Sequence, residues 1–318
     1  MSKSGHSDTL VVGTRGSKLA VAQTQWVIDR LAEAHPHLRI HQQIITTTGD
    51  RLSGRPLPEI GGKGLFTEEL EQALLDGSID LAVHSAKDLP TKLHDDLAII
   101  AWPSREDPRD AYISADGRPF SDLPEGGAVG TTSLRRQAQL LRQRGDLSFV
   151  ALRGNVDTRI HKVRCGDCAG AVLAVAGLKR VGLKHEITEI LDLSLMLPAP
   201  GQGALALEGR SDDHRLAELL APIHDTPTAM AVSCERQILA ALDAGCRAPV
   251  AVYAQIVDGQ LECEALVIDP KARQEARASA ARPCSDIADI AEIASSIVAD
   301  LIATGAEDII RTCRPNTG

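Results

Sequence analysis

One short segment carries a carboxylate next to an ammonium group, a pair that could do acid–base chemistry. Residues 84–90 read His-Ser-Ala-Lys-Asp-Leu-Pro, so Asp88 directly follows Lys87. Apolar residues alternate from 79 to 83, which predicts a strand, and Pro90 prevents that strand from continuing. We therefore expect Asp88 just past the carboxyl end of a strand, where open α/β sheets bind ligands. Taken alone, a Lys–Asp pair on a loop is more often a solvated ion pair.

Arg15 lies at a predicted turn from a strand into a helix. A buried strand is expected from Thr9 to Gly13 and a helix from Lys18 to Ala34, with Ser17 as its N-cap. Backbone N–H groups and the positive end of the helix dipole suit such a turn to binding an anion. A surface arginine in a loop is the equally ordinary interpretation of this segment.

A glycine-rich loop precedes the next predicted helix. After a second expected strand at 38–45, the chain runs through a stretch rich in glycine and proline at 51–64, where Lys63 stands among three glycines. The G-x-x-x-x-G-K-[ST] spacing of a phosphate loop is absent. Lys63 could approach a ligand closely, and a mobile lid is the competing interpretation.

Five further arginines follow three predicted strands. Strands are expected at 128–130, 148–152 and 169–175, and each leads into a loop or helix start that carries basic residues. The residues concerned are Arg135, Arg136, Arg153, Arg159 and Arg180, with Ser133 in the capping cluster before the first two. A parallel sheet would bring these strand ends to one edge. Arginines crowded there without counter-charge would repel one another, so the pattern predicts a ligand with several carboxylates or phosphates. The alternative is that they point to solvent on separate faces.

The composition narrows the class of ligand and the location. The chain has 318 residues, a formal net charge of −9 and only 2% aromatic residues. An acidic chain with few stacking side chains is not expected to bind nucleic acid. No apolar run approaches the ~18 residues of a spanning helix, and the N-terminal residues are polar, unlike a signal peptide. These features predict a cytoplasmic protein that binds a small polyanion and no membrane.

Two segments rich in proline and charged or glycine residues, 102–110 and 198–203, predict crossings between domains. Two crossings suggest two α/β lobes around a central cleft. From residue 221 the pattern changes to a helix at 228–243, two strands joined at Asp258-Gly259, and long helical stretches. The expected domains are domain 1 at 1–103 plus 204–221, domain 2 at 109–197, and a smaller α+β domain 3 at 226–318.

The seven cysteines show no disulfide or zinc pattern. Cys165 and Cys168 form a C-x-x-C pair, but no second pair with zinc spacing accompanies it, so no metal site is predicted. Cys246 follows Gly245 just past a predicted helix end and precedes a basic residue, where an exposed thiol would be partly activated. No histidine lies near it in the sequence, so it does not resemble an acyl-transfer dyad.

Six of these segments carry, in this order, the motifs of one enzyme family. They are Gly61–Phe66, His84–Pro90, Ser133–Gln137, Leu152–Arg159, Leu173–Arg180 and Gly245-Cys246. Together they span nearly the whole chain, and the sequence closely resembles the porphobilinogen deaminase family, whose members are also called hydroxymethylbilane synthases. Ala86 departs from the family pattern, since a larger Met or Leu is common at that place.

The resemblance implies a transferase of tetrapyrrole and haem biosynthesis. Its first two domains would be similar to type II periplasmic binding proteins, and the third would carry a dipyrromethane cofactor attached to Cys246 through a thioether. Four porphobilinogen molecules are then added head to tail, each with loss of ammonia, and water releases hydroxymethylbilane. We also expect a monomer.

By motif position, the resemblance gives each candidate residue a role. Asp88 is the expected catalytic carboxylate, which stabilises cationic pyrroles and assists proton movement. The expected cofactor-binding residues are Cys246, Lys87, Ser133, Arg135 and Arg136. The expected substrate-binding residues are Arg15, Ser17, Lys63, Arg153, Arg159 and Arg180.

Two other functions stay open at this point. Two lobes around a basic cleft would also suit a receptor for a small polycarboxylate, although such a receptor gains nothing from Asp88 or from a thiol at Cys246. A thiol-dependent transferase that uses Cys246 as its nucleophile would lose activity on alkylation but hold no resident chromophore.

Overall fold

The computed structural model describes residues 9–51, 65–243 and 249–313. The chain divides into two compact units, one made of residues 1–104 and 205–226 and the other of residues 105–204 and 227–318. Each unit has its own sheets and its own hydrophobic cores. The finer division into three domains and the cleft between lobes stay predictions.

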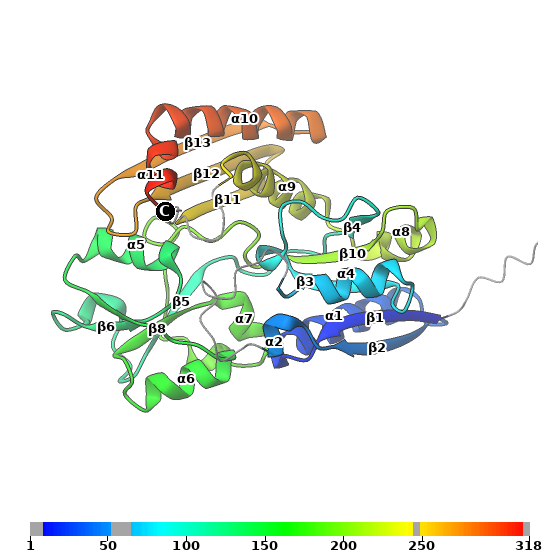
Figure 1. The fold of residues 1–318 in the computed structure, drawn as a ribbon, viewed down its shortest axis with the longest axis horizontal. Coiled ribbons are helices and arrows are strands. Elements are labelled where there is room, and N and C mark those ends of the chain that lie inside the picture. Colours follow the sequence, from blue (N-terminus) through cyan, green and yellow to red (C-terminus); the bar gives the residue numbers. More distant parts are fainter. Residues whose placement is uncertain (1–8, 52–64, 244–248, 314–318) are drawn as a thin grey trace, which may run out of the picture. The chain divides into compact units, whose positions relative to one another are not determined.

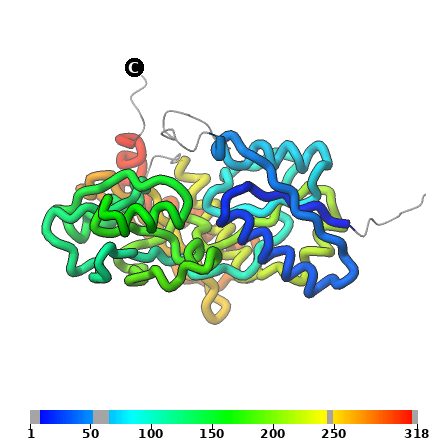
Figure 2. The backbone as a smooth tube through the Cα atoms, turned by 90° about the horizontal axis from the view of Figure 1, so that it is seen from below, coloured from blue at the N-terminus to red at the C-terminus, as the bar shows by residue number. Residues whose placement is uncertain are grey.

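The first unit is built on a five-stranded sheet in the order β2-β1-β3-β10-β4 (Figure 1). The strands are β1 (Thr9–Arg15), β2 (Arg39–Ile45), β3 (Leu81–Ser85), β4 (Leu97–Ala101) and β10 (Leu205–Arg210). β1 pairs in parallel with β2 and β3, whereas β10 runs antiparallel to β3 and β4. Figure 2 shows the yellow-green return segment beside the blue and cyan N-terminal part, so a distant stretch of chain completes this sheet.

Helices cover both faces of this first sheet. They are α1 (Lys18–Ala34), α2 (Thr48–Arg51), α4 (Glu68–Leu75) and α8 (His214–Leu220), with 3-10 turns η1 (Ala86–Asp88) and η4 (Ala221–Ile223). α1 and α8 share a core with Leu10 and Val83, while α4 packs over Ala82 on the opposite face. The predicted range of α1 and its cap are confirmed, since Ser17 Oγ accepts the backbone N–H of Ala20 at 3.2 Å.

The second unit contains a sheet with an equivalent order, β7-β6-β8-β5-β9. Its strands are β5 (Asp110–Ser114), β6 (Ala128–Gly130), β7 (Ser148–Val150), β8 (Gly170–Ala174) and β9 (Glu189–Ile190). Its helices and turns are η2 (Phe120–Asp122), α5 (Leu134–Gln143), α6 (Val156–Arg164), α7 (Val175–Arg180) and η3 (Lys184–Glu186). β6 is parallel to β7 and β8, and β5 is antiparallel to β8 and β9. In both sheets the fourth strand in spatial order is thus antiparallel to its neighbours. In the first unit this strand is β10, the last of its sheet along the chain, and in the second unit it is β5, the first of its sheet along the chain.

The second unit also holds a three-stranded antiparallel sheet, β11-β12-β13. Its elements are α9 (Thr226–Ala241), β11 (Val250–Val257), β12 (Gln260–Ile268), β13 (Glu275–Pro283), α10 (Ile287–Ala303) and α11 (Ala306–Cys313). Alternate residues of the strands share one core with the three helices. The predicted hairpin is confirmed: Asp258 and Gly259 both have positive φ, 49° and 75°, as a tight turn of this kind requires.

Four strands are not predicted from the sequence, namely β4, β5, β9 and β13. The expectation of two strands followed only by helices is wrong, because β13 pairs along its length with β12. Its sequence is rich in alanine, which favours a helix locally, but long-range pairing overrides that propensity. Similarly, Asp110 ends the segment expected to be a linker and instead begins β5.

A fully buried carboxylate on α9 joins three separate stretches of the second unit. Glu235 receives two N–H groups from Arg105, at 2.7 and 3.2 Å. It also accepts the backbone N–H of Gly201 at 2.6 Å and that of Ala254 at 2.8 Å. A buried charge is tolerated only when it is paired and hydrogen-bonded in this way. Glu235 therefore fixes the segments around residues 105 and 201 to strand β11.

Replacing Glu235 by alanine is expected to destabilise the second unit strongly. The change leaves Arg105, whose side chain is 10% exposed, without its counter-charge, and breaking a buried pair in this way costs about 3–5 kcal/mol. Glu275→Ala is the matched control, since it breaks an exposed ion pair with Arg142 and should lower the free energy of unfolding by less than about 1 kcal/mol. Calorimetric unfolding checks both, and equal effects of the two substitutions would contradict the prediction.

Candidate active site

The residues around Asp88 form the end of β3 and the turn that follows it. Leu81 and Val83 are buried in β3, and the chain then turns through η1, whose Ala86 is also buried. Lys87 and Asp88 are exposed on this turn. The predicted placement of Asp88 just past the carboxyl end of a strand is confirmed.

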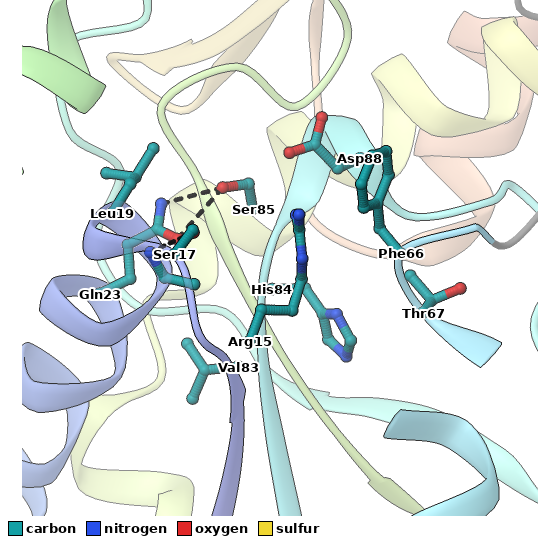
Figure 3. A pocket seen from close by; sticks show the side chains of 11 residues that line it. Arg15, Ser17, Leu19, Gln23, Phe66, Thr67, Val83, His84, Ser85 and Asp88 are labelled. Atoms are coloured by element: carbon teal, nitrogen blue, oxygen red, sulfur yellow. Dashed lines mark hydrogen bonds between the residues drawn. The ribbon is translucent and has the colours of Figure 1, made fainter. Parts of the chain in front are cut away.

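Asp88 lines a pocket that lies within the first unit (Figure 3). The walls come from the β1–α1 junction, the end of β3 and the turn before α4. The lining residues are Arg15, Ser17, Leu19, Ala20, Gln23, Phe66, Thr67, Val83, His84, Ser85 and Asp88. In Figure 3 the guanidinium of Arg15 points toward the side on which Asp88 lies. The structure thus brings together three of the predicted site residues, Arg15, Ser17 and Asp88.

Arg15 is held by a carboxylate and an aromatic ring. Its Nη2 donates to Asp50 Oδ1 at 2.5 Å, and its Nε donates to Asp50 Oδ2 at 3.3 Å. The ring centroid of Phe66 lies 4.1 Å from the guanidinium carbon, within the range of a cation–π contact. Burial raises the pKa of Asp50, but hydrogen bonds from Arg15 and Thr47 outweigh burial and keep that pKa below its ordinary value. Arg15 therefore has a fixed anionic partner inside the protein.

Sequence reasoning does not single out Asp50, Gln23 or Ser85 as residues of this site. Gln23 Nε2 donates to Ser85 Oγ at 2.9 Å and so links α1 to the end of β3 (Figure 3). Gln23 is buried one helical turn after Leu19, so a helical wheel of α1 could have placed it on the inner face. Ser85 belongs to the motif at 84–90. Asp50 has no such local signal, because its partner lies 35 residues away.

His84, which also lines the pocket, pairs with a carboxylate of β10. Its Nε2 lies 2.9 Å from Glu208 Oε2, and both side chains are almost fully buried. In the antiparallel register His84 stands opposite Ala206, so Glu208 is its diagonal neighbour on the same face. Burial, and after it the negative charge of Glu208, raises the pKa of Glu71 on α4. The pair joins β10 to β3 directly beside the site.

In the second unit, Ser133 caps α5 and the two arginines after it are buried. Ser133 Oγ accepts the backbone N–H of Arg136 at 3.4 Å. Arg135 and Arg136 both donate to Asp110, at 2.8 and 2.7 Å, and each also donates to a backbone carbonyl. The expectation that these arginines are crowded without counter-charge is therefore wrong, because Asp110 supplies it from the start of β5.

Asp110 is fully buried and accepts a further N–H from Gln202 at 2.9 Å. Burial by itself raises the pKa of Asp110, but the charges of Arg135 and Arg136 and their hydrogen bonds hold it well below its ordinary value. A carboxyl group with a depressed folded-state pKa stabilises the fold above its unfolded pKa of about 3.9. That stabilisation is lost as the pH falls from there through the folded-state pKa.

The other three predicted arginines lie on separate elements. Arg153 follows β7, and Arg159 on α6 donates from Nε to the carbonyl of Gly154 at 2.8 Å. Arg180 ends α7 and donates to the carbonyl of Gly203 at 2.7 Å, and burial lowers the pKa of Arg180 to about 10. Parallel pairing of β6 with β7 and β8 does place three strand ends at one edge, as predicted. Of the five arginines, Arg135 and Arg136 share one partner, Asp110.

Two predicted site residues, Lys63 and Cys246, lie outside the described residues.

Of the C-x-x-C pair, Cys165 is exposed with its Sγ 3.4 Å from His161 Nε2, while Cys168 is buried. In the part of the chain that the structure describes, no three His, Cys, Asp or Glu side chains are grouped so that they could hold a metal ion. Within residues 9–51, 65–243 and 249–313, no helix combines the length and apolar character needed to cross a membrane.

Comparison with solved structures finds distant likenesses of fold. The periplasmic aliphatic sulphonate binding protein SsuA from Escherichia coli is 15% identical with a TM-score of 0.39, covering 74% of this chain and 70% of that one. The effector binding domain of BenM with its effector benzoate is 14% identical with a TM-score of 0.42, covering 73% of this chain and 92% of that one.

Family models and relatives match far more closely. Residues 10–218 match the dipyromethane cofactor binding domain of porphobilinogen deaminase, and residues 229–303 match the C-terminal domain of the same enzyme. The porphobilinogen deaminase of Syntrophotalea carbinolica is 46% identical over 304 residues, which is 96% of each chain. That of Nitrobacter hamburgensis is 47% identical over 298 residues, 91% of this chain and 94% of the relative. The chain belongs to the porphobilinogen deaminase family.

Proposed function

We propose that this chain catalyses the reaction of its family. It condenses four porphobilinogen molecules head to tail on a covalent dipyrromethane primer, releases one ammonia at each step, and hydrolyses the product to hydroxymethylbilane. This is a transferase reaction of tetrapyrrole, and hence haem, biosynthesis. The observation that carries the proposal is the pocket of the first unit, in which Asp88 lies with Arg15 and Ser17, and the family membership supports it.

Asp88 provides the negative charge that this chemistry needs. Loss of ammonia from an aminomethylpyrrole gives an electron-poor azafulvene, and the pyrrole carbon that attacks it passes through a cationic state. A carboxylate that accepts pyrrole N–H groups stabilises both species, and it can receive the proton that leaves the attacking carbon. The proton given up by that carbon balances the one that ammonia takes up, so each step is neutral overall.

The substrate's own carboxylates account for the arginines. Each porphobilinogen carries an acetate and a propionate group, so the growing chain accumulates negative charge. Arg15 and Ser17 suit one such group, since a guanidinium donates to a carboxylate in a bidentate geometry. Further substrate-binding roles are proposed for Arg153, Arg159 and Arg180 in the second unit and for Lys63, which lies outside the described residues.

The residues proposed to hold the dipyrromethane cofactor keep donors for its carboxylates. Arg136 Nε is buried and has no hydrogen-bond partner, and the Ser133 hydroxyl, which accepts a backbone N–H, retains its proton to donate. Arg135 and Arg136 share the buried carboxylate of Asp110, so Arg135 helps to position Arg136. Lys87 and Cys246, the latter as the thioether residue, complete the proposed set. When bound, the cofactor supplies a free pyrrole carbon as the nucleophile.

A receptor that binds a polycarboxylate without reacting is less well supported. Such a receptor would be weakened by the carboxylate of Asp88 in the same pocket as Arg15. We further propose that the enzyme acts as a monomer in the cytoplasm and does not bind nucleic acid. The formal net charge of −9 supports the last point.

Asp88→Ala is expected to nearly abolish turnover while leaving the fold intact. The side chain is exposed on its turn, so its loss should not change the melting temperature, whereas loss of the charge at the reacting pyrrole should lower kcat by roughly 10³-fold or more. Asp95→Asn removes an exposed carboxylate seven residues further on and should leave kcat unchanged. Steady-state assays with porphobilinogen measure both, and near-normal turnover by the Asp88 variant would refute its role.

Cys246→Ser is expected to lack the covalent cofactor. A serine hydroxyl is a much poorer nucleophile than a thiolate, so it should form no stable thioether equivalent. The measurement is the intact mass under denaturing conditions, where the unchanged protein should exceed its chain mass by two linked pyrrole units and the variant should not. Recovery of a dipyrromethane on the variant would show that another residue carries it.

A further inference from the structure

The segment Thr46–Asp50 lies beside the pocket and has no part in the chemistry described so far. Its last residue, Asp50, occupies one edge of the Arg15 guanidinium, the edge formed by Nε and Nη2, at 3.3 and 2.5 Å. Phe66 covers one flat face of the same group, 4.1 Å away. A guanidinium has five N–H donors in a rigid fork, and the hydrogen bonds to Asp50 use Nε and Nη2 but not the two N–H groups of Nη1. In Figure 3 the guanidinium points toward the side of the pocket on which Asp88 lies.

Asp50, which lies in α2, is itself held in place by Thr47 just before that short helix. Its Oδ2 accepts the hydroxyl of Thr47 at 2.8 Å and the backbone N–H of Thr47 at 3.3 Å. Thr47 is fully buried, so this arrangement belongs to the core of the unit. These two donors and the two from Arg15 favour the ionised carboxyl group, which keeps Asp50 negatively charged beside Arg15.

Phe66 is placed by a glycine of the same turn. A Cβ added to Gly49 would lie 2.1 Å from the Phe66 ring, so any other residue here would displace the ring. The backbone N–H of Gly49 also donates to the carbonyl of Leu65 at 2.8 Å, which joins the turn to the stretch that carries Phe66. One short turn thus sets both the edge contact and the face contact of Arg15.

We propose that Asp50 is a positioning residue that holds Arg15 in the orientation needed to receive a carboxylate group of porphobilinogen. This rests on the proposed function. A guanidinium fixed on one edge and one face loses little conformational freedom when its remaining N–H groups bind a ligand, so the binding is stronger than that of a free side chain. In the opposite role, Asp50 would compete with the substrate carboxylate for Arg15, and removing the charge of Asp50 would lower KM for porphobilinogen instead of raising it.

The test is Asp50→Asn in the holoenzyme, which keeps the shape of the side chain and removes its charge. Positioning predicts that KM for porphobilinogen rises about tenfold while kcat changes less than about twofold, as expected when binding shared by ground and transition state is lost. In an Arg15→Lys background, Asp50→Asn should have no further effect, because Asp50 acts through Arg15. A lower KM, an unchanged KM, or an undiminished effect in the Arg15→Lys background would each overturn the proposal.

Glu69→Gln on α4 is the matched control, because Glu69 contacts the same segment through Thr48 rather than through Asp50. Glu69 Oε1 accepts the backbone N–H and the hydroxyl of Thr48 at 2.7 and 2.6 Å and also pairs with Arg51, but it does not contact Arg15. This substitution loosens the turn without touching the guanidinium, and we expect unchanged KM and kcat. If it raised KM as much as Asp50→Asn does, general loosening would explain the effect and the positioning role would be overturned.

A second readout does not depend on turnover. The Nε–Hε resonance of Arg15, identified by its absence in Arg15→Lys, should be sharp in the unchanged protein and shifted and broadened in Asp50→Asn, because the Asp50 hydrogen bond protects that proton. An unaffected resonance would contradict the proposal. If the unchanged holoenzyme made no hydroxymethylbilane, the proposed function would fail, while this resonance would still decide whether Asp50 orders Arg15.

Discussion

A guanidinium can present its N–H groups to an anionic ligand in a fixed geometry only if the protein holds the rest of the group, and here carboxylates of the chain do so. Asp50 holds Arg15, and Asp110 holds Arg135 and Arg136. In the same way Glu235 on α9 holds Arg105, although that pair serves the fold. The chain has 43 acidic and 34 basic residues. Its acidic excess is compatible with the proposed anion binding, because some of those acids are partners of the arginines proposed to bind the ligand.

The same interactions hold the fold of the second unit together. Asp110 begins β5, the antiparallel strand of the sheet, and its two arginines come from α5, which follows β6. Gln202 donates to Asp110, and its neighbour Gly201 donates to Glu235. The segment 198–203 is therefore fixed at two consecutive residues by two buried carboxylates. Arg135, which a sequence motif assigns to ligand binding, also determines how the connecting segments lie.

Features with a local signal could be predicted from the sequence. The cap at Ser17, the strand and turn that carry Asp88, and the hairpin at Asp258-Gly259 all depend on neighbours a few residues apart, and the structure confirms them. Features set by distant partners could not. Asp110 lies 25 residues from Arg135, and no local pattern showed that its carboxylate would neutralise the arginines. The alanine-rich β13 likewise became a strand because β12 offered it a partner.

Asp88 and Arg15 raise a problem of charge within one pocket, and Asp50 offers a solution. A catalytic carboxylate beside a free guanidinium tends to pair with it, and pairing would reduce the negative charge available to a cationic pyrrole. In the described part of the chain Asp88 forms no ion pair, whereas Arg15 is already neutralised by Asp50. Under the proposed function, the remaining N–H groups of Arg15 bind a substrate carboxylate, while Asp88 contributes the net negative charge. The proposed anion recognition and stabilisation of a cation can thus coexist within one pocket, because Arg15 already has its own counter-charge.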